Sequence, residues 1–252
     1  MNVVRSEWTK LRSVRGTWTL VVVAILASAA VGLLGVTSQL GGWRSALPHD
    51  FDPTVESLKG LLVGQLLIGT LGASVMASEY GHGTIVTTLA IVPDRVRLLA
   101  AKALLTAAIA AVAAVAITAS CFLLGQAAIA AAGLPGASLT DPAVLRALGG
   151  AVVYLTAVAL LGLGIATLTR SASTALGVLV TLALLGPALT PALPGAVGDA
   201  IAEYWPLAAG QAGYAVVRTA DHVAPGVGVA VLLAFTALVG VAATAAMRRR
   251  DA

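Results

Sequence analysis

The side chains that could do chemistry are few in this sequence, and they do not combine into a familiar catalytic pattern. None of the three lysines (Lys10, Lys59 and Lys102) follows a glycine. The chain therefore lacks the GxxxxGK[ST] loop whose backbone cradles nucleotide phosphates. It cannot bind and split ATP by that route.

Hydrolase and metal chemistry are equally unsupported. Ser74 and Ser138 have glycine two residues before them but not two residues after, so neither completes G-x-S-x-G. The three histidines (His49, His82 and His222) are too far apart for H-E-x-x-H. We favour ordinary loop residues over a surface metal site for His49 and His222. We predict no catalytic, cofactor-binding or metal-binding residues in this chain, and no enzyme activity of its own.

One polar stretch stands between two long apolar runs: Ser78–Lys102, SEYGHGTIVTTLAIVPDRVRLLAAK. Glu79 marks the end of the first run, and the glycines after it, Gly81 and Gly83, favour a helix break. Thr84 is a good N-cap for a new helix. Its residues Ile85, Leu89 and Val92 share one face at helical spacing.

Pro93 ends this short helix, and Asp94 can cap the helix that follows. We expect Arg95, Arg97 and Lys102 to hold that next helix at the inner side of a membrane. A braced helix of this kind suits a contact with a soluble motor. The alternative is an ordinary loop with an interfacial helix, and the pattern alone favours neither.

The composition identifies the solvent around the chain as lipid. Of its 252 residues, 59% are hydrophobic and 10% charged, with a mean hydropathy of +0.97. Soluble domains carry about 25% charged residues. The basic charges flank apolar runs instead of forming one stripe, which excludes nucleic-acid binding. The single cysteine, Cys121, permits no intrachain disulfide.

Apolar runs predict an all-α integral membrane protein with six transmembrane helices, each having the roughly 20 residues that a span needs. We expect one transmembrane domain over 1–252, with spans near 17–38, 60–78, 103–125, 147–169, 172–192 and 226–247. Six spans with both termini inside place 11 of the 15 basic residues on the cytoplasmic side. Splitting the long third run would violate the positive-inside rule.

The two remaining polar regions have simple interpretations. Before the first span, Val4, Trp8, Leu11 and Trp18 recur at helical spacing among basic residues. This predicts a helix in the inner interface whose basic side chains, Lys10 included, reach lipid phosphates. At the end of the fifth span, glycines and prolines prevent a regular helix. Residues 196–225 should then lie on the external side of the membrane.

No acidic residue lies within a predicted span, which argues against a proton- or sodium-coupled carrier. The energy for any transport should therefore come from a partner.

Four segments together resemble bacterial ABC-2-type permeases, the membrane subunits of ABC exporters. They are RSEWTKLRSVRGTW (5–18), SEYGHGT (78–84), AIVPDRVRLLAAK (90–102) and EYWPLAAGQ (203–211). The resemblance implies an N-terminal interfacial elbow helix at Asn2–Arg15 and a short cytoplasmic coupling helix at Thr84–Pro93, between helices 2 and 3. It also implies an assembly of two permeases, the second a copy or a paralogue, with two ABC ATPase subunits that use the ATP.

The resulting hypothesis is a permease subunit of an ATP-driven exporter in the bacterial cytoplasmic membrane. The expected contacts to the ATPase are Glu79, Gly83, Thr84, Ile85, Leu89, Pro93 and Arg95. Glu79 should pair with Arg95, Arg97 or the ATPase, although it could equally mark a helix end. The alternatives are an ion-coupled carrier or channel, and a membrane immunity or assembly protein without transport.

Overall fold

The computed structural model describes residues 3–81, 83–84, 94–189, 192–193, 195–217 and 223–249. These residues form helices and connecting turns without any strand. The first half contains α1 (Val3–Ser13), α2 (Arg15–Ser45), α3 (Pro53–Ser57), η1 (Leu58–Gly60), α4 (Leu61–Gly81) and α6 (Arg95–Ala131).

The second half contains α7 (Pro142–Thr169), α8 (Ala172–Val180), the π-helical η2 (Thr181–Leu185), α9 (Gly186–Leu189), α10 (Gly195–Tyr204), α11 (Pro206–Gln211), η4 (Ala212–Tyr214) and α12 (Pro225–Arg249). The described residues include six helical segments long and apolar enough to cross a membrane. This confirms the predicted all-helical membrane fold.

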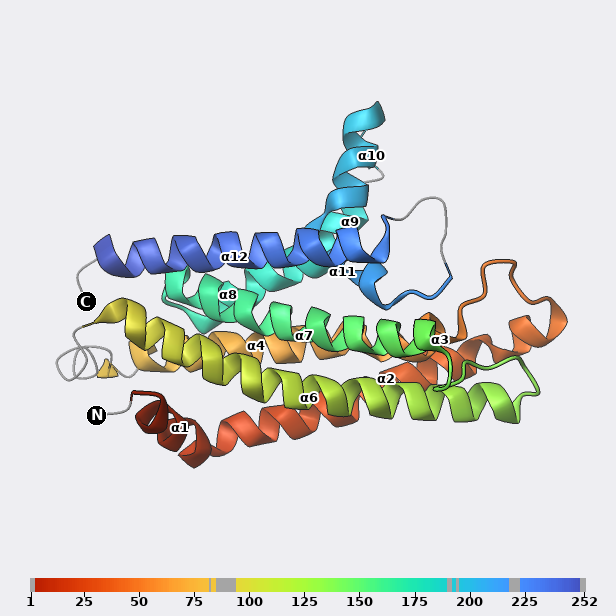
Figure 1. The fold of residues 1–252 in the computed structure, drawn as a ribbon, viewed down its shortest axis with the longest axis horizontal. Helices are drawn as coiled ribbons and strands as arrows, with labels where there is room; N and C mark the ends of the chain where they lie inside the picture. Colours follow the sequence, from red (N-terminus) through yellow and green to blue (C-terminus); the bar gives the residue numbers. More distant parts are fainter. Residues whose placement is uncertain are drawn as a thin grey trace.

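The long helices lie side by side in one bundle, with both chain termini at the same end (Figure 1). We call this the terminal end. The short α1 is set at an angle to α2 there, separated from it by Val14, whose backbone is extended. A separate helix at this position agrees with the predicted elbow helix.

The third apolar run forms one helix, as predicted. α6 has 37 residues, and its C-cap Ala132 precedes Gly133, whose φ of 73° is left-handed. A helix of this length rises about 56 Å, well beyond the roughly 30 Å hydrocarbon core of a bilayer. Its far end therefore extends past the bundle's membrane-embedded part.

Helices α4 and α7 form the centre of the bundle and are the most deeply buried spans. Their backbones approach so closely that a Cβ at Gly72 would overlap the carbonyl oxygen of Ala159. A Cβ at Gly162 would likewise overlap the carbonyl oxygen of Gly69. Small residues at such crossings allow dense packing in lipid, where hydrophobic burial between helices gives little driving force.

The fifth span is irregular, as the glycines and prolines of its second half predicted. α8 passes into a π-helical turn, η2, and then into α9, which contains Pro187. Trp205 supports this irregular stretch because its indole Nε1 donates to the carbonyl oxygen of Leu182 at 2.6 Å. The ring also lies directly against Gly186.

The segment after the fifth span packs partly against the bundle. α10 projects from the bundle (Figure 1), but α11 and η4 pack against α12 and α7. Leu207 is fully buried, and Trp205 is held by its hydrogen bond to Leu182 in η2. The apolar residues of EYWPLAAGQ explain this burial, because the segment has enough apolar surface to join the core.

Candidate functional site

Four charged side chains meet at the terminal end of the bundle, and we call them the charge cluster: Glu7, Lys10, Glu79 and Lys102. Lys102 Nζ donates to Glu7 Oε2 at 2.6 Å and to Glu79 Oε1 at 2.8 Å. Lys10 Nζ donates to Glu7 Oε1 at 2.8 Å and to Glu79 Oε1 at 3.1 Å. Two positive and two negative groups therefore neutralise one another.

Each member of the cluster comes from a helix whose sequence aims it inward. On α1, Val3, Glu7 and Leu11 are buried, at a spacing of four residues that defines one face. Glu79 lies in the last turn of α4, and Lys102 lies two turns into α6 among buried leucines and alanines. The cluster thus joins the N-terminal helix to the two helices that flank residues 82–93.

Three members of the cluster are almost fully shielded from solvent. Glu7 is 3%, Glu79 6% and Lys102 2% exposed, whereas the side chain of Lys10 is 47% exposed. Removing charges from water is costly, and only close pairing with good hydrogen bonds offsets that cost. Losing one member would leave an uncompensated buried charge, so the four residues act as one unit.

The pKa values of the α1 members are consistent with stable charges at neutral pH. Burial would raise the pKa of Glu7, but hydrogen bonds from Lys10 and Lys102 and their positive charges lower it below 4.5. Burial would lower the pKa of Lys10, but its bonds to Glu7 and Glu79 raise it above 10.5. The stabilisation from Glu7 is lost only as pH falls through its lowered pKa, and that from Lys10 only as pH rises through its raised pKa.

The predicted pairing of Glu79 with Arg95 or Arg97 was wrong. Glu79 instead pairs with Lys10 and Lys102. Lys102 is a buried member of the cluster, with both carboxylates as partners. Lys10 bonds to two carboxylates instead of extending only toward lipid phosphates.

In the N-terminal segment the two tryptophans are exposed, as the predicted interfacial position requires, whereas Leu11 faces the bundle. Trp8 and Trp18 are 39% and 41% exposed, while Glu7 lies on the buried face with Val3 and Leu11. Glu7 is the member of the cluster that sequence reasoning missed. Its spacing of four from Val3 and from Leu11 was the available signal, obscured because a glutamate is rarely buried without a partner.

The entry to residues 82–93 is shaped by backbone features that the sequence predicted. Gly83 adopts φ 65°, a left-handed conformation that follows the end of α4 at Gly81. Thr84 Oγ1 donates to the carbonyl oxygen of Glu79 at 3.4 Å. Both residues thus lie within one turn of the charge cluster.

Asp94 and Arg95 fix the start of α6, directly after residues 82–93. Asp94 Oδ1 accepts a hydrogen bond from the Arg97 backbone N–H at 3.0 Å, which confirms its predicted role as N-cap of α6. Arg95 Nη1 donates to the carbonyl oxygen of Met247 at 2.8 Å and so links α6 to the end of α12. The other predicted site residues, Ile85, Leu89 and Pro93, lie outside the described residues, as does most of the predicted coupling helix.

Arg170 adds a further basic group at this end of the bundle. It occupies a left-handed position between α7 and α8, with φ 56°. Its guanidinium lies 5.4 Å from the centroid of the Tyr80 ring, a cation–π contact with the residue next to Glu79. The last turn of α4 is thus contacted from α1, α6 and the α7–α8 turn.

The opposite end of the bundle has its own polar connection. Asp52 Oδ1 caps α3 by accepting from the backbone N–H groups of Thr54 and Val55. Its second oxygen, Oδ2, accepts from the backbone N–H groups of Val216 and Val217 at 2.7 and 2.8 Å. Asp52 is therefore a structural link between two distant connections. No cluster of metal-binding side chains occurs among the described residues.

A short polar chain lies inside the bundle. The Tyr154 hydroxyl donates to Gln65 Oε1 on α4 and accepts from Gln211 Nε2 on α11 at 3.5 Å. The Tyr154 ring also contacts Tyr214 edge to face, with centroids 5.7 Å apart. These side chains connect the α11–η4 segment to the two central helices.

Six apolar spans and an angled N-terminal helix define a multi-pass membrane protein. A family model described as ABC-2 family transporter protein matches residues 3–186. This is most of the chain, and the chain therefore belongs to the ABC-2 transporter family. No curated protein matches the chain.

Proposed function

We propose that the chain is the membrane permease subunit of an ATP-driven ABC exporter and that a separately encoded ATPase docks on residues 84–93. The observation that carries this proposal is the charge cluster. Glu79 lies on α4 before the segment, and Lys102 lies on α6 after it. Both pair with residues of α1, so the cluster connects the helices on either side of the segment to the N-terminal helix. A force applied to the segment would pass directly into α1, α4 and α6.

The family membership supports a membrane subunit that depends on a separate ATPase, since ABC-2 membrane proteins work with ATPase partners. The proposed orientation places the terminal end in the cytoplasm, where ATP is available. The basic residues Arg5, Arg12, Arg97 and Arg170 lie at this end in agreement with the positive-inside rule. The membrane is then the bacterial cytoplasmic membrane, with both termini inside.

A dimeric assembly of two permeases is the second part of the proposal. Spans α2, α8–α9 and α12 are only lightly buried within one chain, whereas α4 and α7 are largely covered. This leaves outer faces for a second copy or a paralogue as well as for lipid. No cofactor is proposed for the chain itself, because ATP would be used by the partner.

The proposal predicts that Leu89→Asp abolishes recovery of the ATPase from native membranes. A charge on the apolar face of the segment would remove a docking contact and bury an unpaired carboxylate. Such a loss should cost about 2 kcal/mol or more, or roughly 30-fold in affinity. The measurement is affinity purification of the tagged chain, followed by detection of a Walker-type ATPase.

Leu139→Asp is the matched control, because Leu139 is an exposed leucine at the opposite end of the bundle. It should insert normally and retain the ATPase. If Leu89→Asp inserts and still brings the same amount of ATPase, docking through this segment is ruled out. If the wild-type chain transports an ion down its gradient without any ATPase, the alternative of a secondary carrier or channel holds instead.

A further inference from the structure

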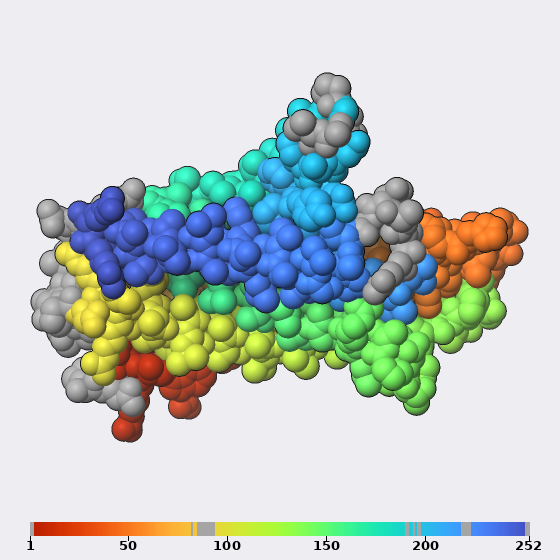
Figure 2. Space-filling model, turned by 45° about the horizontal axis from the view of Figure 1, so that its top comes forward, coloured from red at the N-terminus to blue at the C-terminus, as the bar shows by residue number. Residues whose placement is uncertain are grey.

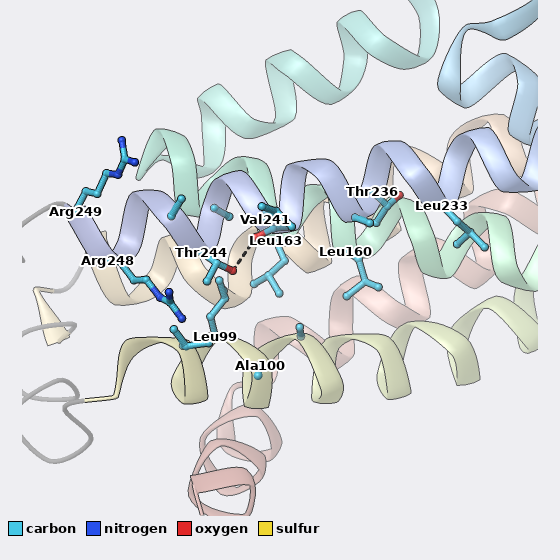
Figure 3. A pocket seen from close by; sticks show the side chains of 17 residues that line it. Leu99, Ala100, Leu160, Leu163, Leu233, Thr236, Val241, Thr244, Arg248 and Arg249 are labelled. Atoms are coloured by element: carbon cyan, nitrogen blue, oxygen red, sulfur yellow. Dashed lines mark hydrogen bonds between the residues drawn. The ribbon is translucent and has the colours of Figure 1, made fainter.

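A groove runs along the outside of the bundle between α6 and α12, with α7 as its floor. Its volume is about 770 Å³. We call it the α6–α12 groove. Its walls are mostly aliphatic and include Leu99, Leu160, Leu163, Leu233, Val241 and Thr244 (Figure 3).

The two threonines of the groove do not offer free hydroxyl groups to a polar ligand. Thr236 Oγ1 donates to the carbonyl oxygen of Leu232, and Thr244 Oγ1 donates to that of Gly240, both at 2.8 Å. These bonds satisfy the donors within α12. The groove therefore suits a hydrocarbon chain better than a hydrophilic solute.

The groove faces away from the bundle axis. Val241 and Leu233, on its rim, are 66% and 45% exposed, and α12 as a whole is one of the least covered spans. In the space-filling view the surfaces of α12 and α6 run alongside one another on one face of the molecule (Figure 2). Lipid is the solvent for this face of a membrane-spanning helix.

The terminal end of the groove is basic. Arg248 and Arg249 line it and are exposed. Arg248 extends toward the start of α6, near Leu99, while Arg249 extends from the other side of α12 (Figure 3). Neither arginine takes part in a salt bridge with any other residue that the structure describes.

We propose that the α6–α12 groove binds one acyl chain of an anionic phospholipid, with the lipid phosphate at Arg248. An apolar channel that ends at an exposed guanidinium, one without a salt-bridge partner among the described residues, matches an acyl chain joined to a phosphate. From Leu233 to Arg249 the helix rises about 24 Å, more than the roughly 15 Å depth of one leaflet. The groove is therefore long enough for a chain that starts at the headgroup level.

The test is native mass spectrometry of the purified full chain in detergent, titrated with phosphatidylglycerol or with phosphatidylcholine of the same acyl chains. Arg248→Gln should weaken phosphatidylglycerol binding about fivefold, the effect of one basic residue beside an anionic headgroup. It should weaken phosphatidylcholine binding less, because the choline cation leaves that headgroup with no net charge. Arg12→Gln, which removes an exposed arginine from α1 at the same end, is the matched control and should change neither.

A second variant fills the groove without changing charge. A Cβ at Gly240 meets no atom within 4 Å, so Gly240→Leu can be accommodated in α12 while it occupies the channel. It should reduce the binding of both lipids at least tenfold. Gly41→Leu, at an equally open glycine on α2, should bind as the wild type does. Thermal unfolding midpoints equal to the wild type establish that each variant is folded.

Three results would overturn the proposal. Equal affinity for the two lipids, with no effect of Arg248→Gln, would show non-specific annular lipid only. Binding that survives Gly240→Leu would place the lipid elsewhere. A Gly240→Leu variant that keeps its lipid but loses a chain–chain complex would show that a second copy occupies the groove.

Discussion

Lys102→Met is expected to destabilise the folded chain by about 3–5 kcal/mol, because it leaves Glu7 and Glu79 buried with only Lys10 between them. Methionine keeps the length of the apolar stem but removes the ammonium group that bonds to both carboxylates. The measurement is the thermal unfolding midpoint in detergent, together with the fraction of monodisperse protein. Both should fall well below the wild-type values.

Two comparisons separate the loss of the cluster from a general effect of removing a lysine. Lys59→Met breaks the partly exposed pair with Glu56, which should contribute at most about 1 kcal/mol. The triple variant Glu7→Gln, Glu79→Gln, Lys102→Met has no buried charge from these three positions and should recover most of the stability. A Lys102→Met chain as stable as the wild type would show that the cluster does not hold the helices together.

Gly162→Val is expected to disrupt the centre of the bundle, where the new side chain would overlap the backbone of α4 at Gly69. Backbone atoms cannot move aside as a flexible side chain can, so the helices must separate. The cost should reach about 3 kcal/mol, at the high end of the range for overpacked cores. The same unfolding measurement detects it as a large decrease in midpoint.

Gly177→Val is the control for this substitution. Gly177 lies on α8, where a Cβ would meet no atom within 4 Å, and the variant should be as stable as the wild type. Should Gly162→Val unfold at the wild-type temperature, α4 and α7 would not be in the close contact described here.

The sequence was sufficient for the parts of the fold that hydropathy and turn chemistry determine. Charge-free runs of about 20 residues require spans in lipid. The single long α6, its Asp94 cap and the left-handed Gly83 follow from local rules that need no knowledge of neighbours.

The charge cluster depends on tertiary contacts and could not be predicted in the same way. Lys102 lies 95 residues from Glu7, and nothing local indicates that their side chains meet. The expectation that basic residues near span ends face lipid phosphates is correct on average. It fails for Lys10, because two buried carboxylates offer it better partners.

The α11–η4 segment shows the same limit. The glycines and prolines before it correctly predicted an irregular end of the fifth span, but nothing local indicated that α11 packs against α12. Trp205 donates to Leu182, and Leu207 is buried against the bundle. Burial of apolar residues from α11 outweighs the polar composition of the surrounding segment.

The most direct measurement of the central claim is photocrosslinking in intact cells, with a photoreactive residue at Thr84 or, in a matched variant, at Ser138. Both positions are exposed, and they lie at opposite ends of the bundle. We predict that the Thr84 probe forms a covalent adduct with a Walker-type ATPase and that the Ser138 probe does not. An ATPase adduct at Ser138, or none at Thr84 in a correctly folded chain, would contradict ATPase docking at the terminal end.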